Sequence, residues 1–476
     1  MRVAAPSDRI EHSRAALAHA VSIRSWRQAL SLGRSDATLA PAIRVGLATA
    51  VVLIAGGLIG RPELAGFAAL GATCSAFGRY EPYPRRAGKL ALVGGMIVLY
   101  ATLAALVGVV APSAAIEVIA VSIAAGVAAL LLAAFAVMGP GAVIPVFAST
   151  AAIAFAHTAA DVVTVFLATA VGALVGLGAA LLPALLHPAG PAQLAVARAL
   201  AAVDAHRGTP RDEPARAAIA HARTVVTLNG GARADRHRLA LMTLLDDAEG
   251  LLDAWARGDD PAHAETVLAH ERALRALRRY DGLPTGAAVA LPAPPRSFFA
   301  EGLARITSRS LILNGIRIAI AAALAGWCAS ALGFEHPLWA TMGAVAAMQG
   351  VTFQSTVQRG IQRLLGNMAG AAIAAGLLAL SPGYWQAVLA VVAFQVTAEL
   401  LVVKNYALLS IAVTPMALIL TGLAGHLSPA VAIDRVGDTL VGVLIGITVA
   451  AVTIEIGDRQ HLPAPLNPGP NPGRED

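Results

Sequence analysis

Long apolar runs, separated by short polar or charged segments, dominate the chain. One set falls near residues 42–60, 63–78, 88–110, 114–138, 140–157 and 161–186, and a second near 311–332, 337–349, 364–380, 384–402, 405–422 and 434–455. Most are long enough to cross a bilayer, where only helices or closed barrels satisfy the backbone. Because the runs are continuous and rich in Ala, Leu and Val, they predict an all-α polytopic membrane protein of about twelve helices.

The two sets of runs repeat each other in sequence. Arg44-Val-Gly-Leu-Ala corresponds to Arg317-Ile-Ala-Ile-Ala, and the stretch 172–176 (Gly-Ala-Leu-Val-Gly) corresponds to 442–446 (Gly-Val-Leu-Ile-Gly). Each set has an even number of spans, so both enter the membrane from the same side. We therefore expect two parallel six-helix repeats, related by an axis along the membrane normal.

A more polar stretch separates the two repeats. Its apolar residues have helical spacing, with Gly- and Pro-containing breaks near 208–210, 230–231 and 258–261, which predicts a small four-helix bundle. The expected domains are an N-terminal segment (1–38), a first membrane repeat (39–187), a helical domain with its linker (188–305), a second membrane repeat (306–457) and a disordered tail (458–476). A Pro- and Ala-rich linker is expected at 284–296.

Composition supports a membrane protein and sets its orientation. The chain is 57% hydrophobic and only 13% charged, whereas soluble proteins carry roughly 25% charged residues. The net charge of +6 comes from Arg and Lys beside apolar runs, at 79–89 and 359–363. This pattern argues against nucleic-acid binding and predicts that both termini and the 187–305 stretch are cytoplasmic.

The N-terminal segment has no apolar core before Ile43, so no cleavable signal peptide is expected. The stretch 21–30 favours either a helix on the membrane surface or a mobile tail. Cys74 and Cys328 lie inside apolar runs, which indicates small buried residues rather than a disulfide.

The motifs of common enzymes and of ATP-driven transporters are missing. Gly88-Lys89 is followed by Leu, and Tyr83 stands where a phosphate-binding loop needs its first Gly. We therefore expect neither enzymatic activity nor a cofactor. His263 and His270 lie on one helix without further ligands in register, so no metal site is expected either.

The second run of each half is the shortest and opens with an acidic residue. Glu63 follows a proline, while Glu335 and His336 precede Pro337-x-Trp339. Short segments at corresponding positions point to a transporter's binding site. Ordinary capping by proline and an interfacial tryptophan explain the same pattern, so both interpretations stay open.

Basic residues form a second group of candidates. Arg44 and Arg317 lie about one turn inside the first run of each half, where they either attract an organic anion or extend toward the headgroups. Arg359 and Arg363, four residues apart, share one helix face. They either form a vestibule that concentrates anions or act only as topology signals.

Acids inside apolar runs are costly and commonly functional. Asp434 and Asp438 enter the last run, and Asp161 enters the sixth. These three are candidates for a proton relay, with Asp438 the deepest, although an ion pair of Asp438 with Arg435 or Arg317 is an equal alternative. Glu399 is expected to pair with the nearby Lys404.

Several motifs of the second half resemble the fusaric acid resistance family, which includes aromatic acid exporters and is distantly similar to plant aluminium-activated malate channels. They are His336-Pro-Leu-Trp339, Gln-Arg359-Gly-x-x-Arg363-x-x-Gly, Asn405-Tyr406-Ala and Thr414-Pro415. The first half departs from them, with Glu63-Leu-Ala-Gly-Phe in place of His-Pro-x-Trp. The resemblance implies efflux of small, often aromatic, organic acids across a bacterial inner membrane.

The leading hypothesis is thus an inner-membrane secondary exporter of small organic acids, with Arg44, Arg317, Arg359 or Arg363 attracting the anion. An anion channel of the malate-channel type is one alternative. A non-transporting scaffold that recruits partners through its soluble bundle is another. The expected partners are lipid and an organic anion, and the sequence leaves a homo-oligomer and a periplasmic adaptor open.

Overall fold

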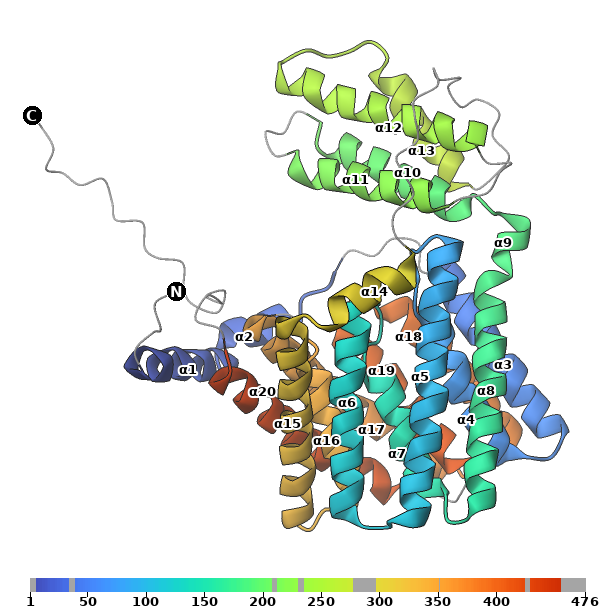
Figure 1. The fold of residues 1–476 in the computed structure, drawn as a ribbon, viewed down its shortest axis with the longest axis vertical. Helices are drawn as coiled ribbons and strands as arrows, with labels where there is room; N and C mark the ends of the chain where they lie inside the picture. Colours follow the sequence, from blue (N-terminus) through green and yellow to red (C-terminus); the bar gives the residue numbers. More distant parts are fainter. Residues whose placement is uncertain are drawn as a thin grey trace, which may run out of the picture.

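The computed structural model describes residues 6–33, 39–207, 212–229, 235–276, 297–350, 352–423 and 429–454. Its regular elements within these ranges are helices, as the sequence predicts (Figure 1). The expected linker at 284–296, the expected tail at 458–476 and His426 lie outside the described residues.

A helix lies at each of the apolar runs. The first half contains α3 (Leu39–Leu58), α4 (Pro62–Ala72) with the 3-10 helix η1 (Thr73–Ala76), α5 (Tyr83–Val110), α6 (Ala114–Ala134), α7 (Val143–Phe155) and α8 (Ala159–Leu181). The second contains α15 (Arg309–Ala331), α16 (Pro337–Ala347), α17 (Phe353–Ala379), α18 (Tyr384–Leu401), α19 (Tyr406–Gly422) and α20 (Ala430–Val452). Within the described residues, 8 helices are long and apolar enough to cross a membrane. The prediction of a multi-pass helical membrane protein is confirmed.

Two helices begin earlier than the hydropathy pattern predicts. α5 starts at Tyr83 rather than at 88, and α17 starts at Phe353 rather than at 364. Thr352 caps α17. Its hydroxyl accepts a hydrogen bond from the Ser355 backbone N–H, and the Ser355 hydroxyl accepts one from the Thr352 backbone N–H. As a result Arg359 and Arg363, which lie ahead of the apolar run at 364–380, belong to the first three turns of α17 and share a helix face, as their spacing predicts.

The repeated glycines mark close helix crossings in both halves. A Cβ on Gly172 of α8 would overlap the Ala68 carbonyl oxygen of α4, and a Cβ on Gly442 of α20 would overlap the Ala340 carbonyl oxygen of α16. In each half the second helix therefore packs backbone to backbone against the sixth. Small residues allow this approach in membrane helices.

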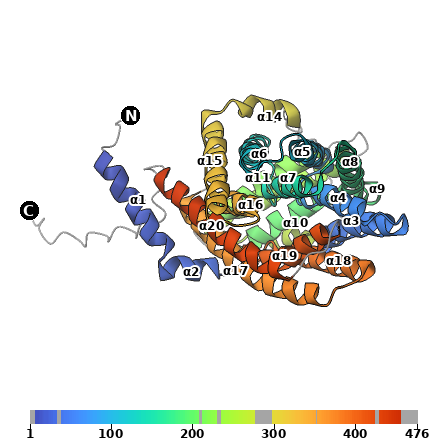
Figure 2. The same cartoon turned by 90° about the horizontal axis from the view of Figure 1, so that it is seen from below.

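The two halves exchange their packing partners. α3, the first helix of one half, packs on α18, the fourth helix of the other, and α15 packs on α6 in the same way (Figure 2). The Tyr384 hydroxyl donates a 2.6 Å hydrogen bond to the Leu53 carbonyl across the first contact. Gly126 and Gly315 bring the backbones of α6 and α15 together at the second. Each half is thus completed by a helix of the other.

Between the halves, α9 (Pro183–Leu186) leads from α8 to a bundle of α10 (Gly190–Ala205), α11 (Glu213–Leu228), α12 (Asp235–Ala256) and α13 (Ala264–Arg275) (Figure 1). This bundle has its own apolar core, which includes Leu200, Ile219, Leu245 and Leu251. The return helix α14 (Phe298–Ile306) packs on α5 and α6. Its Glu301 pairs with Arg85, and Phe298 packs 5.3 Å from the Phe135 ring.

The N-terminal helices α1 (Pro6–Ala20) and α2 (Ile23–Ala29) pack against the end of the second half (Figure 2). The Gln28 side-chain oxygen accepts hydrogen bonds from Gln354 and Gln358 of α17, at 2.9 and 3.2 Å. Asn405 donates to the Ala29 carbonyl at 2.9 Å. Of the two alternatives for this stretch, the structure shows a docked helix rather than a mobile tail.

Candidate functional site

A cavity lies between the two halves. Its wall comes from α4, η1 and α7 on one side and from α16 to α20 on the other. The wall is mostly apolar, and its polar side chains are Thr73, Arg363, Gln395, Glu399, Tyr406, Ser410 and Arg435. The cavity volume is about 100 Å³, whereas ligand sites commonly measure roughly 300–1,000 Å³. The cavity must therefore widen before it can take an organic molecule.

Two facing rows of polar side chains, on α17 and α19, meet the cavity at Arg363, Tyr406 and Ser410. α17 presents Arg359, Arg363 and Asn367 at four-residue intervals, and α19 presents Tyr406, Ser410 and Thr414 in the same spacing. The Arg359 guanidinium lies 4.5 Å from the centre of the Tyr406 ring, and Arg363 Nη1 donates to the Tyr406 hydroxyl at 3.5 Å. Further along, the Thr414 hydroxyl donates to Asn367 Oδ1 at 2.5 Å. The rows place cationic groups at one end and neutral polar groups at the other.

Arg363 and Arg435 bring two guanidinium groups to the cavity. Both side chains are buried, at 5% and 3% exposure. The Nε atom of each is shielded from solvent without a hydrogen-bond partner. No carboxylate lies within ion-pairing distance of either group in the described part of the chain. Arg435 instead packs over the Trp339 ring, 4.7 Å from its centre. Buried cations normally have anionic partners, so this arrangement suits a bound anion.

Asp438 lies one turn beyond Arg435 on α20. It is 1% exposed, and neither carboxylate oxygen has a hydrogen-bond partner among the described residues. Arg317, one of the partners suggested by the sequence, donates from Nε to the Thr453 hydroxyl at 2.8 Å, near the other end of α20. Asp438 is therefore an uncompensated buried acid close to Arg435.

An ion pair joins the two halves beside the cavity. Arg79, from the loop after η1, pairs with Glu399 of α18, and its Nη2 also donates to the Glu399 carbonyl at 3.0 Å. The expected pairing of Glu399 with Lys404 is wrong. Arg79 follows η1, which packs on α3, and α3 packs in turn on α18.

The remaining candidates divide into those near the cavity and those far from it. Arg44 approaches the Arg79–Glu399 pair, and its Nη2 donates to the Ser75 carbonyl at 3.2 Å. Arg317 does not line the cavity, so the two arginines that the repeat made equivalent have different surroundings.

Two acidic candidates form local contacts. Glu63 pairs with Arg61. Asp161 caps α8, where its Oδ2 accepts from the His157 and Thr158 backbone at 3.0 and 2.8 Å, so geometry gives it a structural role.

Four candidates meet where α16 begins. The His336 ring stacks on Trp339 with centroids 4.4 Å apart and an interplanar angle of 11°. Trp339 carries Arg435 on its ring. Glu335, His336 and Asp434 bring one ligand atom each within 4.8 Å of one another. The N-terminal end of α16 is thus linked to the cavity by side-chain contacts, from His336 to Trp339 and from Trp339 to Arg435.

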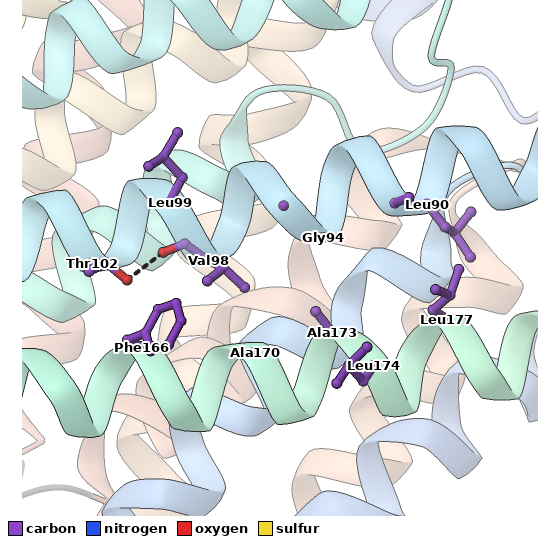
Figure 3. Close-up of a pocket in the computed structure, with 12 residues that line it drawn as sticks. Leu90, Gly94, Val98, Leu99, Thr102, Phe166, Ala170, Ala173, Leu174 and Leu177 are labelled. Atoms are coloured by element: carbon purple, nitrogen blue, oxygen red, sulfur yellow. Dashed lines mark hydrogen bonds between the residues drawn. The ribbon is translucent and has the colours of Figure 1, made fainter. Parts of the chain in front are cut away.

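A second pocket, of about 490 Å³, lies between α5 and α8 (Figure 3). Its lining is apolar apart from Thr102, whose hydroxyl already donates to the Val98 carbonyl at 2.7 Å. Leu99, Phe166 and Leu174 are exposed there, as expected for side chains that face lipid. Without a charged or free polar group this groove cannot select an anion, so we place the candidate site in the smaller cavity.

Comparison with known proteins separates the second half from the rest of the chain. Residues 321–449 match the fusaric acid resistance protein-like family. A curated relative, "Uncharacterized membrane protein YvaC" of Bacillus subtilis (strain 168), is 32% identical over 157 residues, which are 32% of this chain and 25% of that protein. The match thus spans about a quarter of the relative's length. No solved structure matches the chain significantly.

The family match contains the polar side chains that the second half contributes to the cavity. Arg363, Tyr406 and Arg435 lie between residues 321 and 449, as do Arg359 and Asp438 beside the cavity. The resemblance to fusaric acid resistance proteins that the motifs predicted is confirmed for this stretch.

Sequence reasoning missed Tyr406, Arg435 and Asn367 as site residues, and it misassigned Glu399. One signal could have found two of these positions, Asn367 and Tyr406. Polar residues recur at every fourth position inside two otherwise apolar runs, and this spacing puts them on one helix face. The positions of Arg435 and Glu399 depend on contacts between distant helices, which the spacing does not reveal.

Proposed function

We propose that the protein is a secondary exporter of small organic anions, with aromatic carboxylates as the substrate class, in a bacterial inner membrane. The family match of residues 321–449 supports transport as the general role. We further propose that both termini and the α10–α13 bundle face the cytoplasm, in line with the basic residues around them.

One observation carries the proposal: the cavity between the halves holds two buried guanidinium groups, on Arg363 and Arg435, whose Nε donors lack partners among the described residues. A carboxylate would supply the missing acceptors, since guanidinium groups bind carboxylates through paired, charge-assisted hydrogen bonds. Phe147 and the Tyr406 ring offer the apolar surface that an aromatic ring requires.

Transport further requires that the cavity opens alternately to the two sides. The Arg79–Glu399 pair and the exchanged helices α3 and α15 hold the halves together in the conformation seen here. We propose that the two halves act as parallel repeats that rock against each other around the cavity. Protonation of Asp438 would couple this movement to the proton gradient.

The test uses efflux of labelled benzoate from membrane vesicles. Arg363→Gln and Arg435→Gln should each lower the efflux rate by about tenfold or more, because each removes a charge-assisted bond worth roughly 1.5–3 kcal/mol. Arg309→Gln, which changes an exposed arginine at the start of α15, should leave efflux unchanged.

Membrane insertion is measured alongside, so that loss of protein is not mistaken for loss of transport. Wild-type rates in both Arg363→Gln and Arg435→Gln, at normal protein levels, would exclude the proposed anion site. Efflux that follows only the electrochemical gradient of the anion, and does not depend on the proton gradient, would indicate a channel instead.

A further inference from the structure

The N-terminal end of α16 and the first turns of α20 bring together three side chains of metal-binding type. Glu335 and His336 precede Pro337, and Asp434 lies on α20. One ligand atom from each lies within 4.8 Å of the other two. The sequence predicts no metal site, since no single helix carries a set of ligands, and these three residues come together only through the α16–α20 crossing.

The surroundings of these side chains leave their ligand atoms available. Within the described residues, no hydrogen bond or ion pair is formed by the carboxylates of Glu335 and Asp434. Nδ1 of His336 is shielded from solvent and has no hydrogen-bond partner. Two carboxylates this close repel each other unless a cation or a proton compensates them. A buried imidazole nitrogen without a hydrogen-bond partner is a separate indication that this side chain can bind a ligand.

The imidazole is also held in place. Stacking on Trp339 fixes the plane of the His336 ring, and the Trp339 ring also packs against the Arg435 guanidinium. Glu335 and Asp434 are exposed and can rotate. A metal with bond lengths of about 2.0–2.2 Å in a tetrahedral site needs ligand atoms roughly 3.4 Å apart. Small rotations of the two exposed carboxylates reach that spacing without moving the histidine.

We propose that Glu335, His336 and Asp434 bind one Zn²⁺ ion. One imidazole nitrogen and two carboxylates are ligands that zinc accepts, with water completing the tetrahedron. Ca²⁺ and Mg²⁺ prefer sites made of oxygen atoms alone. The bound ion links the start of α16 to α20 and adds positive charge beside the Trp339–Arg435 stack.

The first half offers a comparison inside the same chain. Glu63 lies in the first turn of α4, directly after Pro62, but its carboxylate pairs with Arg61, and no histidine precedes the helix. The site therefore belongs to the second half alone, and this asymmetry follows from two residues, Arg61 and His336.

The experiment measures Zn²⁺ binding to the full-length protein purified in detergent, by calorimetry and by the shift of its unfolding temperature. Wild type should bind one equivalent, and unfolding should move to higher temperature, because a ligand that binds only the folded state stabilises it. His336→Gln and Asp434→Asn should weaken binding by about tenfold or more. His157→Gln, which removes another loop histidine ahead of a membrane helix, should bind as wild type does.

Unfolding temperatures without zinc show whether each variant is folded, so a loss of binding can be assigned to the ligands. Absence of binding in the wild type, or equal binding in His336→Gln, would overturn the proposal. If Ca²⁺ stabilised the protein as much as Zn²⁺ does, the assignment of the site to zinc would be overturned. None of these measurements depends on whether the protein exports organic acids.

Discussion

Asp438 is buried in α20, and its carboxylate oxygens have no hydrogen-bond partner among the described residues. Placing an ionised carboxylate in such surroundings is costly. The nearby Arg435 lowers that cost only in part, since it lies over the Trp339 ring. A group of this kind can take up a proton when the anion leaves Arg435 and release it when the anion binds.

Asp438→Asn keeps the size of this side chain but replaces the carboxyl group by an amide, which can neither take up nor release a proton. We expect the variant to lose accumulation driven by an imposed proton gradient while it still exchanges labelled for unlabelled benzoate. Exchange serves as the internal control for folding and binding. Proton-driven transport at the wild-type rate would show that the coupling proton lies elsewhere.

For single residues, the sequence indicated which side chains belong to the candidate site better than it indicated which groups they contact. It singled out Arg359, Arg363 and Asp438, and the structure places all three at or beside the cavity. It also grouped Asp161 with Asp438, although Asp161 is a helix cap. Both are acids at the start of an apolar run, and the structure distinguishes them by burial and by the hydrogen bonds of Asp161 to His157 and Thr158.

Helix crossings at glycine give a prediction at the scale of elements. In Gly172→Ala the new methyl group would overlap the Ala68 carbonyl, and α8 would have to move away from α4. We expect destabilisation of about 1–3 kcal/mol, as for other overpacked sites, measured as a lower unfolding temperature in detergent.

Gly178→Ala on the same helix is the matched control, because nothing lies within 4 Å of the Cβ it adds. Alanine also favours helix by up to about 1 kcal/mol over glycine. This variant should be unchanged or slightly more stable. A Gly172→Ala protein as stable as the control would show that the α4–α8 crossing is looser than described.

Hydropathy located each membrane helix but not each helix start. The runs mark only the apolar part of each helix, so the polar first turns of α5 and α17 fall outside them. The Thr352–Ser355 cap extends α17 backward through Arg359 and Arg363. A search for capping residues ahead of basic stretches would have recovered this boundary.

The Arg79–Glu399 pair joins the halves at the scale of the whole molecule. Both side chains are nearly buried, at 10% and 8% exposure. Removing one partner of a buried pair commonly costs about 3–5 kcal/mol because the other charge is left alone. We therefore expect Arg79→Ala and Glu399→Ala to lower the unfolding temperature strongly, and the double variant to lose less than the sum.

The exposed pair Arg257–Asp259, with 65% and 67% exposure, is the control for this cycle. Exposed pairs contribute about 0–1 kcal/mol, so Arg257→Ala should have little effect. Additive losses in the Arg79/Glu399 cycle would mean that the two side chains act independently, and that the halves are held by helix packing alone.

The exchange of helices between the halves also bears on how the chain is made. α3 is inserted early, yet the helix it packs against, α18, follows more than three hundred residues later in the sequence. During synthesis the helices α3 to α8 therefore lie in the bilayer with the α18-contacting surface of α3 exposed to lipid. Only when α18 is inserted can that surface be covered, so α3 completes its contacts late, although it can pack on α4 and α8 much earlier.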